Sequence, residues 1–271
     1  MNKFKAFILL TRPLNSLIAI FVVFVALRIA GCFTFSDFFI ASLAVVLLSS
    51  FANSMNDLMD YKVDKAAHPK RPLPSGALNS KEAAVFTIVL FILTLVVSFA
   101  INRNSRIIFF VILVLVISYN LYFKRIAFLG NLIVSIILGG AFIFAGSICD
   151  NVKAEIIPFF FALLYNLARE LVKDAEDSGK EAEYGYRTLP VVLGINGTKA
   201  ILAFYNAVIL LYAVIVYFLA YRSTIYLAII TVVSVITLAA SALSRNFTFL
   251  SLLYKILMIP VLIAIWIGGV R

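Results

Sequence analysis

Long hydrophobic blocks separated by short polar connections run through this chain from end to end. The nine blocks span residues 14–30, 38–60, 83–101, 107–123, 128–148, 156–172, 198–221, 224–243 and 247–270. Each can cross a hydrocarbon core about 30 Å thick as an α-helix. Polar and apolar residues do not alternate within the blocks, as they would in the strands of a β-barrel. The pattern predicts an all-α, polytopic membrane protein with nine transmembrane helices.

The composition agrees with a membrane protein and indicates one domain. Hydrophobic residues make up 63% of the chain and charged residues 13%, whereas about a quarter of the residues in a soluble domain are charged. The first block is longer than the hydrophobic region of a signal peptide, so we expect it to remain as a span. The longest polar connections, 61–81 and 173–196, are too short to form a soluble domain. We therefore expect a single membrane domain over residues 1–271.

Basic residues are distributed unequally between the two sides of the predicted bundle. With a cytoplasmic N-terminus, 16 Lys and Arg residues fall on the cytoplasmic side and six on the other, and Lys255 lies inside the last block. Cytoplasmic connections normally carry this excess, so we expect a cell-membrane protein with its N-terminus and active site on the cytoplasmic side. The basic face suits anionic lipids and phosphorylated substrates. No basic domain stands clear of the membrane, so we expect no nucleic-acid partner.

An acidic motif lies at the end of the second block. Asn53, Asn56, Asp57, Asp60 and Asp64 recur at spacings of three and four residues, which place most of them along one helical face. Carboxylates packed this closely repel one another unless a cation neutralises them. A set of oxygen ligands without Cys or His favours Mg²⁺ over zinc.

A second acidic motif follows the sixth block. Glu170 and Asp174 are four residues apart, Asp174 and Asp177 are three apart, and Asp177 and Glu181 are four apart. Basic residues lie among these acids and after the first motif. Metal ions and cations around a small volume can form a diphosphate clamp. Ordinary surface salt bridges at helix ends are the alternative, but nine of the 13 acidic residues lie in or just after the two motifs.

Each acidic motif is followed by a similar basic segment. Arg71-Pro-Leu-Pro follows the first motif, and Arg187-Thr-Leu-Pro follows the second. The shared order of apolar helix, carboxylates, polar loop and Arg-x-Leu-Pro turn indicates two pseudo-repeated halves, about 1–125 and 126–271. A chance match is the alternative. In a repeat, we expect the two motifs to face each other across a common cavity.

Cysteine and histidine are rare in this chain. Cys32 and Cys149 are the only cysteines, and both are expected near the outer face, either as a disulfide or as two separate thiols. His68 is the only histidine, which argues against a histidine-based metal site or catalytic triad.

The two motifs resemble those of the UbiA superfamily of intramembrane prenyltransferases. Its first signature is similar to Asn56-Asp57-x-x-Asp60-x-x-x-Asp64 followed by Lys70-Arg71-Pro-Leu-Pro-Ser-Gly76, and its second to Lys173-Asp174-x-x-Asp177 with Tyr186-Arg187-Thr-Leu-Pro190. Thr11-Arg12-Pro13-Leu-Asn15 and Tyr119-Asn-Leu-Tyr-Phe-Lys124-Arg125 fit the same family. The resemblance therefore covers nearly the whole chain.

The resemblance implies nine transmembrane helices around a central cavity, which opens sideways to lipid and has a polar cap on the cytoplasmic side. It implies two Mg²⁺ ions bridged by the diphosphate of an allylic donor. The implied metal ligands, whose acids are also the catalytic residues, are Asn53, Asn56, Asp57, Asp60, Asp64, Asp174 and Asp177. The implied diphosphate ligands are Lys70, Arg71, Lys124 and Lys173. Many relatives have Asp-x-x-x-Asp in the second motif, so Asp177 and Glu181 are an alternative pair for the second metal.

Within the superfamily, Arg169-Glu-x-x-Lys-Asp-x-Glu-Asp177 is most similar to the digeranylgeranylglyceryl phosphate synthases of archaeal ether-lipid synthesis. This implies transfer of geranylgeranyl from its diphosphate to the free hydroxyl of geranylgeranylglyceryl phosphate. Arg12, Lys62 or Lys65 would bind the phosphate of this lipid acceptor. The bilayer is the other implied partner, and no obligate protein partner is implied.

Three alternatives remain open at this point. An aromatic acceptor such as 4-hydroxybenzoate, a quinone precursor, would use the same chemistry. A solute transporter is an alternative of another class, but transporters carry ionisable residues near the midplane, where this chain has only Lys255. A purely structural membrane protein is the third. Six tyrosines near the expected cavity are candidates for shielding a carbocation: Tyr61, Tyr119, Tyr122, Tyr165, Tyr184 and Tyr186.

Overall fold

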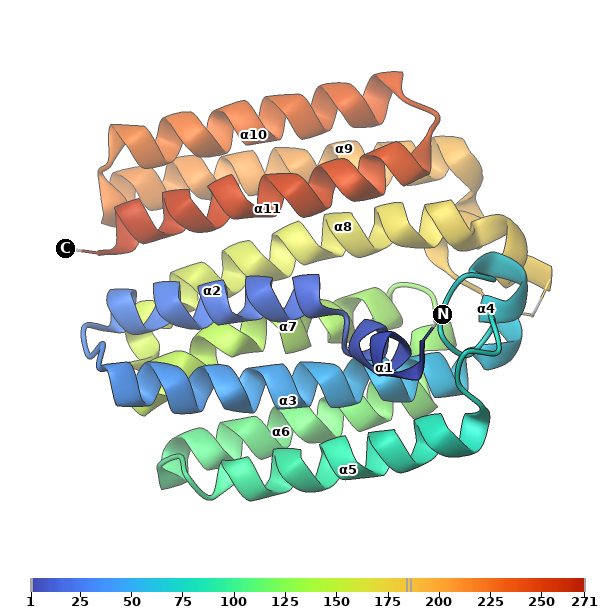
Figure 1. Cartoon of the computed structure of the whole chain (residues 1–271). Coiled ribbons are helices and arrows are strands. Elements are labelled where there is room, and N and C mark those ends of the chain that lie inside the picture. Colours follow the sequence, from blue (N-terminus) through green and yellow to red (C-terminus); the bar gives the residue numbers. More distant parts are fainter. Residues whose placement is uncertain (1, 184, 186, 271) are drawn as a thin grey trace.

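Nine long helices run side by side, and two short helices lie at one end of the bundle (Figure 1). This is a computed structural model, and it describes residues 2–183, 185 and 187–270, apart from the side chains of Lys180 and Glu181. The long helices in these residues are α2 (Pro13–Ala30), α3 (Phe35–Met59), α5 (Ser80–Ser98), α6 (Arg103–Leu121), α7 (Leu129–Ile148), α8 (Ile156–Glu183), α9 (Leu189–Val216), α10 (Thr224–Leu243) and α11 (Phe247–Gly269). The remaining helical segments are α1 (Lys3–Thr11), α4 (Tyr61–Ala67), the 3₁₀ turns η1 (Phe123–Arg125) and η2 (Val152–Glu155), and the π-helical turn η3 (Tyr217–Tyr221).

The predicted all-α membrane fold is confirmed, because the nine predicted spans correspond to the nine long helices of the described residues. Eight helical stretches among these residues are long and apolar enough to cross a membrane. The remaining long helix, α8, carries Arg169, Glu170 and Lys173 beside its apolar half. These charges distinguish α8 from the other spans, and they face a cavity between helices.

Two helices extend about ten residues beyond the predicted spans. The second acidic motif is helical, because α8 continues past residue 172 to Glu183. α9 begins at Leu189, well before the predicted start at residue 198, and has Pro190 in its first turn, a position where proline is well tolerated. α9 bends at Gly194, whose φ of 67° is readily adopted only by glycine. The polar and glycine residues of this segment hid the helix from the hydrophobic pattern.

The N-terminus and α4 lie at one end of the bundle, and the C-terminus lies at the other (Figure 1). At the α4 end, Ala6 and Leu10 of α1 pack with Leu73 and Leu78 of the connection that follows α4. This small apolar cluster holds α1 across the end of the bundle. Arg12, directly after α1, is thereby held close to α3.

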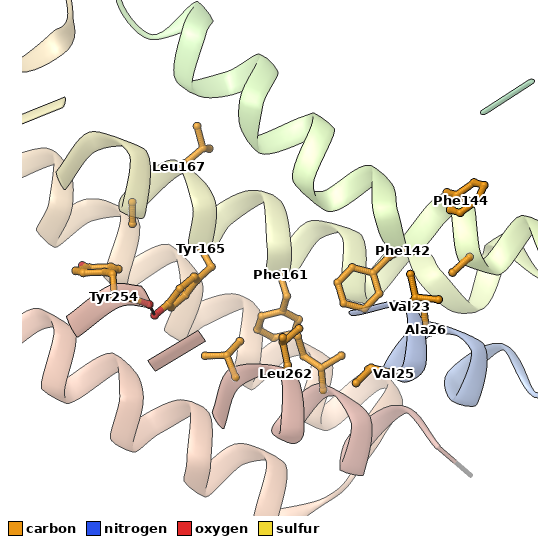
Figure 2. Close-up of a cluster of buried hydrophobic side chains, with 14 of the residues drawn as sticks. Val23, Val25, Ala26, Phe142, Phe144, Phe161, Tyr165, Leu167, Tyr254 and Leu262 are labelled. Carbon is orange, nitrogen blue, oxygen red and sulfur yellow. Dashed lines mark hydrogen bonds between the residues drawn. The ribbon is translucent and has the colours of Figure 1, made fainter. Parts of the chain in front are cut away.

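Large side chains from several helices fill the centre of the bundle. Figure 2 shows Phe161 of α8 beside Phe142 of α7, with Leu262 of α11 next to it. Phe142 and Phe161 are completely buried, and Leu262 is nearly so. Close packing of this kind holds membrane helices together, because lipid tails are as apolar as the helices themselves. Phe142 and Leu262 also line the cavity described below, so the core forms part of its wall.

Cys32 and Cys149 form a disulfide, the first of the two alternatives left by the sequence. Cys32 follows α2, and Cys149 caps the end of α7. The disulfide therefore joins two connections at the end of the bundle opposite α4.

Glu155 is a buried carboxyl at the disulfide end, in the η2 turn between two spans. Neither of its carboxylate oxygens has a hydrogen-bond partner within the described residues. Gly146 of α7 permits this close packing, because a Cβ atom at Gly146 would overlap with Cγ of Glu155. Burial raises the pKa of Glu155 to about 9, so the side chain is protonated at neutral pH.

Replacing Glu155 with Gln is expected to stabilise the protein above about pH 5. The folded protein retains a proton that the unfolded chain releases above the usual pKa of 4.5. Wild-type stability therefore falls as the pH rises through the window between the unfolded and folded pKa values, by about 3 kcal/mol at neutral pH. Thermal unfolding in detergent across this window measures the difference, with Glu183→Gln at the exposed end of α8 as a control. A melting-temperature gain that does not grow with pH would contradict the prediction.

Candidate active site

A cavity of about 270 Å³ lies between α2, α3, α6, α7, α8 and α11. Most of its lining is apolar, as at Val22 of α2 and Ile265 of α11. The polar lining includes residues from both acidic motifs: Asn53, Asn56, Arg169, Glu170 and Lys173. Residues of both motifs therefore line one cavity, although the motif aspartates are not among its lining residues: Asp57, Asp60, Asp64, Asp174 and Asp177.

The first acidic motif crosses the junction between α3 and α4. α3 ends at Met59, so Asp60 lies between two helices and not inside a single one. The backbone N–H of Asp60 donates to the carbonyl of Asn56 at 2.9 Å, and that of Asp64 donates to the carbonyl of Asp60 at 2.8 Å. These bonds keep the four-residue helical spacing across the junction.

Two arginines from different loops bind carboxylates of the first motif. Arg12 Nη2 donates to Asp57 Oδ1 at 2.6 Å. Arg71 Nη1 donates to Asp64 Oδ2 at 2.6 Å and lies 3.9 Å from Asp57 Oδ1. Asp57 and Asp64 are buried, and these ion pairs offset the loss of hydration that burial imposes. Arg12 has a φ of 51° at the turn from α1 to α2, which is uncommon for a residue other than glycine.

Lys124 binds the third carboxylate of the first motif. Its Nζ donates to Asp60 Oδ1 at 2.5 Å, and its side chain is buried in the η1 turn. Gly130 allows α7 to start directly beside this turn. A Cβ atom at Gly130 would lie 3.0 Å from the carbonyl oxygen of Phe123 and 3.2 Å from Cα of Lys124. The short connection from η1 to α7 thus places Lys124 at the acidic site.

The acids of the second motif have different partners. Asn131 Nδ2 of α7 donates to Asp174 Oδ2 at 2.9 Å. His68 Nε2 lies 3.3 Å from Asp177 Oδ1, which joins the segment after the first motif directly to the second. Burial acts to raise the pKa of Asp177, but the hydrogen bond and charge of His68 and the charge of Lys173 outweigh it and lower the pKa.

Glu170 is buried and binds two cations of its own helix. Arg169 Nη1 donates to Glu170 Oε1 at 2.7 Å, and Lys173 Nζ donates to Glu170 Oε2 at 3.1 Å. These three residues form a charged group on the wall of the cavity.

Two acids retain raised pKa values despite their polar partners. Burial raises the pKa of Asp64, although Arg71 acts in the opposite direction. Burial and the negative charge of Glu170 raise the pKa of Asp174 to about 7. Asp174 keeps some accessible surface but is enclosed by packed protein. Both carboxylates would gain from additional positive charge.

The residue types fit Mg²⁺, although their oxygens do not converge in this arrangement. The described residues contain no group of three His, Cys, Asp or Glu side chains placed around one point. Basic side chains bind the carboxylate oxygens of the first motif instead. The donors are carboxylates and amides, the oxygen ligands that Mg²⁺ prefers, and Asp174 is bound by the neutral amide of Asn131.

The predicted phosphate-binding residues lie in different places. Lys70 and Arg71 line a second, open hollow beside the cavity, and Arg12 lines both spaces. Lys62 and Lys65 are exposed on α4 and line neither space.

The candidate tyrosines also separate into groups. Tyr119 and Tyr165 line the cavity, whereas Tyr61 and Tyr122 do not. Tyr184 and Tyr186 lie outside the described residues, as does the side chain of Glu181, the alternative second-metal ligand.

Three asparagines near the site were not predicted from the sequence. Asn131 binds Asp174, and Asn120 and Asn166 line the cavity with buried amide oxygens that have no partner among the described residues. An amide side chain inside an apolar span is the sequence feature that could have identified them. Such groups are costly in lipid and therefore face the bundle interior.

Comparison with known proteins identifies similar chains. The UbiA prenyltransferase family model matches residues 16–268. The digeranylgeranylglyceryl phosphate synthase of Methanosarcina mazei is 36% identical over 245 residues, which cover 88% of this chain and 84% of that protein. A solved structure of digeranylgeranylglyceryl phosphate synthase has a TM-score of 0.76 and 28% identity, and the match covers 100% of this chain and 99% of that one. A UbiA homologue from Archaeoglobus fulgidus bound to DMAPP and Mg²⁺ has the same fold, with a TM-score of 0.64 and 17% identity over 96% of this chain and 98% of that one.

Proposed function

Because this chain belongs to the UbiA prenyltransferase family, we propose that it transfers a geranylgeranyl group from geranylgeranyl diphosphate to the free hydroxyl of geranylgeranylglyceryl phosphate. The main observation behind the proposal is the cavity, whose wall combines polar residues of both motifs with an apolar space between helices. The similarity to digeranylgeranylglyceryl phosphate synthases over most of the chain supports this acceptor.

The donor diphosphate binds at the polar end of the cavity in this proposal. Asp57, Asp60 and Asp64 would hold the Mg²⁺ ions together with Asn53, Asn56, Asp174 and Asp177. A relative of the same fold binds DMAPP with Mg²⁺, which supports this use of divalent metal. Bound Mg²⁺ supplies positive charge that stabilises the leaving diphosphate.

The basic side chains can then bind either the carboxylates of the two motifs or the phosphate oxygens of the donor. Arg71 and Lys124 bind carboxylates in the structure, and both are long enough to contact phosphate oxygens when the acids bind metal. Lys70 and Lys173 contribute further positive charge near the diphosphate. Pre-placed cations of this kind stabilise the charge that develops as the C1–O bond breaks.

The reaction proceeds by breakage of the allylic C1–O bond, which leaves both bonding electrons on the diphosphate. The allylic cation lies in the apolar cavity, where the lining excludes water and the faces of Tyr119 and Tyr165 can stabilise positive charge. The acceptor oxygen forms the new bond to C1, and its proton passes to the released diphosphate. The prenyl chain occupies the apolar part of the cavity, toward Ala141 and Ile265.

The acidic site faces the cytoplasm in this proposal. The excess of basic residues at the α4 end supports this orientation, and so does the disulfide at the opposite end, because disulfides persist in oxidising surroundings. A cysteine introduced at Lys62 is expected to react with an impermeant maleimide only in inside-out vesicles. Reaction in right-side-out vesicles would reverse the orientation.

The test of the proposed function uses purified protein with radiolabelled geranylgeranyl diphosphate. Geranylgeranylglyceryl phosphate and 4-hydroxybenzoate are offered separately, with Mg²⁺ or with EDTA. Mg²⁺-dependent label in a two-chain phospholipid is the expected result. Transfer only to the aromatic acid would retain the chemistry and replace the acceptor, and absence of any transfer by folded protein would overturn the proposal.

A further inference from the structure

The wall of the cavity carries more positive than negative side chains. Arg12, Arg169, Lys173 and Lys255 line it, whereas Glu170 is the one acidic residue in its described lining. Arg169 and Lys173 both bind Glu170, and Arg12 binds Asp57. Lys255 has no ion pair or hydrogen bond within the described part of the chain. An ammonium group inside a transmembrane helix without a partner is costly and points to a function.

Lys255 of α11 lines the same cavity as residues of the second acidic motif on α8. Tyr165 Oη of α8 donates to the carbonyl of Tyr254 at 2.6 Å, and Figure 2 shows the two rings next to each other. This bond joins α8 and α11 at the two residues that directly precede Asn166 and Lys255. Lys255, Arg169 and Arg12 all line this cavity, so the three cations border one shared space.

Asn166, which lines the same cavity, provides a hydrogen-bond acceptor without a partner in the described residues. Its Nδ2 donates to the carbonyl of Ala162 at 2.8 Å, which fixes the orientation of the amide. Its Oδ1 is buried and has no partner in the described residues. The same cavity lining thus presents excess positive charge and an acceptor for an O–H group. A head group with a phosphate and a hydroxyl has this complementary pattern.

We propose that Lys255 and Arg169 form an anion subsite that binds the phosphate monoester of the lipid acceptor. The inference rests on the proposed function and assigns the acceptor phosphate to this subsite, in place of the exposed Lys62 and Lys65. Arg169 and Lys173 share the single negative charge of Glu170. Together with Lys255 they leave two positive charges, which a phosphate monoester dianion balances. In the proposed function, residues of the two signatures bind the donor diphosphate. Lys255 belongs to neither signature.

The test measures acceptor binding without metal, so that it does not depend on turnover. Wild-type protein in EDTA is titrated calorimetrically with geranylgeranylglyceryl phosphate and with the same lipid lacking its phosphate. We expect the phosphorylated lipid to bind more tightly, and Lys255→Met to weaken its binding about 10- to 100-fold without changing the binding of the neutral lipid. Lys255→Arg keeps the charge and is expected to restore most of the affinity. Lys153→Met, on the exposed η2 turn, is the matched control.

Two results would overturn the inference. One is unchanged binding of the phosphorylated lipid to Lys255→Met. The other is weakened binding of a non-reactive donor analogue, geranylgeranyl thiodiphosphate with Mg²⁺, which would assign Lys255 to the donor diphosphate. Phosphate-dependent lipid binding that is lost in Lys255→Met but accompanied by no transfer in the wild type would support the subsite and contradict the proposed function. Failure of the subsite proposal can therefore be distinguished from failure of the proposed function.

Discussion

Asp60→Asn is expected to lower kcat about 1000-fold, because it removes a charged metal ligand from the site where the diphosphate leaves. Asparagine has nearly the same volume as aspartate, so the packing between α3 and α4 is retained. The loss of the ion pair with Lys124 is the main structural change. Steady-state transfer of radiolabelled geranylgeranyl measures kcat, and thermal unfolding confirms that the variant is folded.

The control for this variant is Asp37→Asn. Asp37 lies in the first turn of α3, at the end of the same helix away from Asp60, and asparagine can serve there as aspartate does. Asp174→Asn in the second motif is expected to match Asp60→Asn in its effect. Near-normal turnover of both Asp60→Asn and Asp174→Asn would contradict the metal assignment.

Ala141→Trp is expected to lower turnover of the twenty-carbon donor about 100-fold and to retain transfer from short donors. Ala141 lines the cavity on α7, about 18 Å along that helix from its start at Leu129. An indole at this depth fills space that the end of a long prenyl chain needs, whereas a five-carbon chain stays near the acids. Parallel assays with dimethylallyl, geranyl and geranylgeranyl diphosphate give the chain-length profile.

Ala207→Trp provides the matched control for this substitution. Ala207 is exposed on α9 and does not line the cavity, so the same increase in volume points away from the site. An equal loss of activity with all three donors in Ala141→Trp would show that the variant disturbs packing and does not block a chain-binding space.

The hydrophobic blocks predicted the helices, because a membrane span must be long enough to cross the bilayer and apolar along its length. The exceptions lie where function adds polar residues to a helix. α8 carries Arg169 and Glu170 beside its apolar half, and its continuation through the second motif was not apparent from hydrophobicity. The start of α9 was hidden for a related reason, since Gly194 and its neighbours interrupt the apolar pattern while the backbone remains mostly helical.

The members of the site were more predictable than their partners. Regular spacing identified the acids, but spacing within one helix carries no information about contacts across 64 residues, such as Lys124 with Asp60. His68 was considered only for a histidine-based metal site or catalytic triad, both of which a single histidine argues against. Its contact with Asp177 depends on how α4 packs against α8. Lys255 was visible as a charge inside a span, but its position in the same cavity as Arg169 depends on the packing of α11 against α8.

The central claim is that the two acidic motifs bind a metal–diphosphate complex together. The most direct measurement is the electron paramagnetic resonance titration of Mn²⁺ in the presence of geranylgeranyl thiodiphosphate, for the wild type, Asp60→Asn and Asp174→Asn. The account predicts two bound Mn²⁺ ions per wild-type chain that depend on the analogue, and loss of bound Mn²⁺ in each variant. Full, analogue-dependent Mn²⁺ binding in both variants would contradict it.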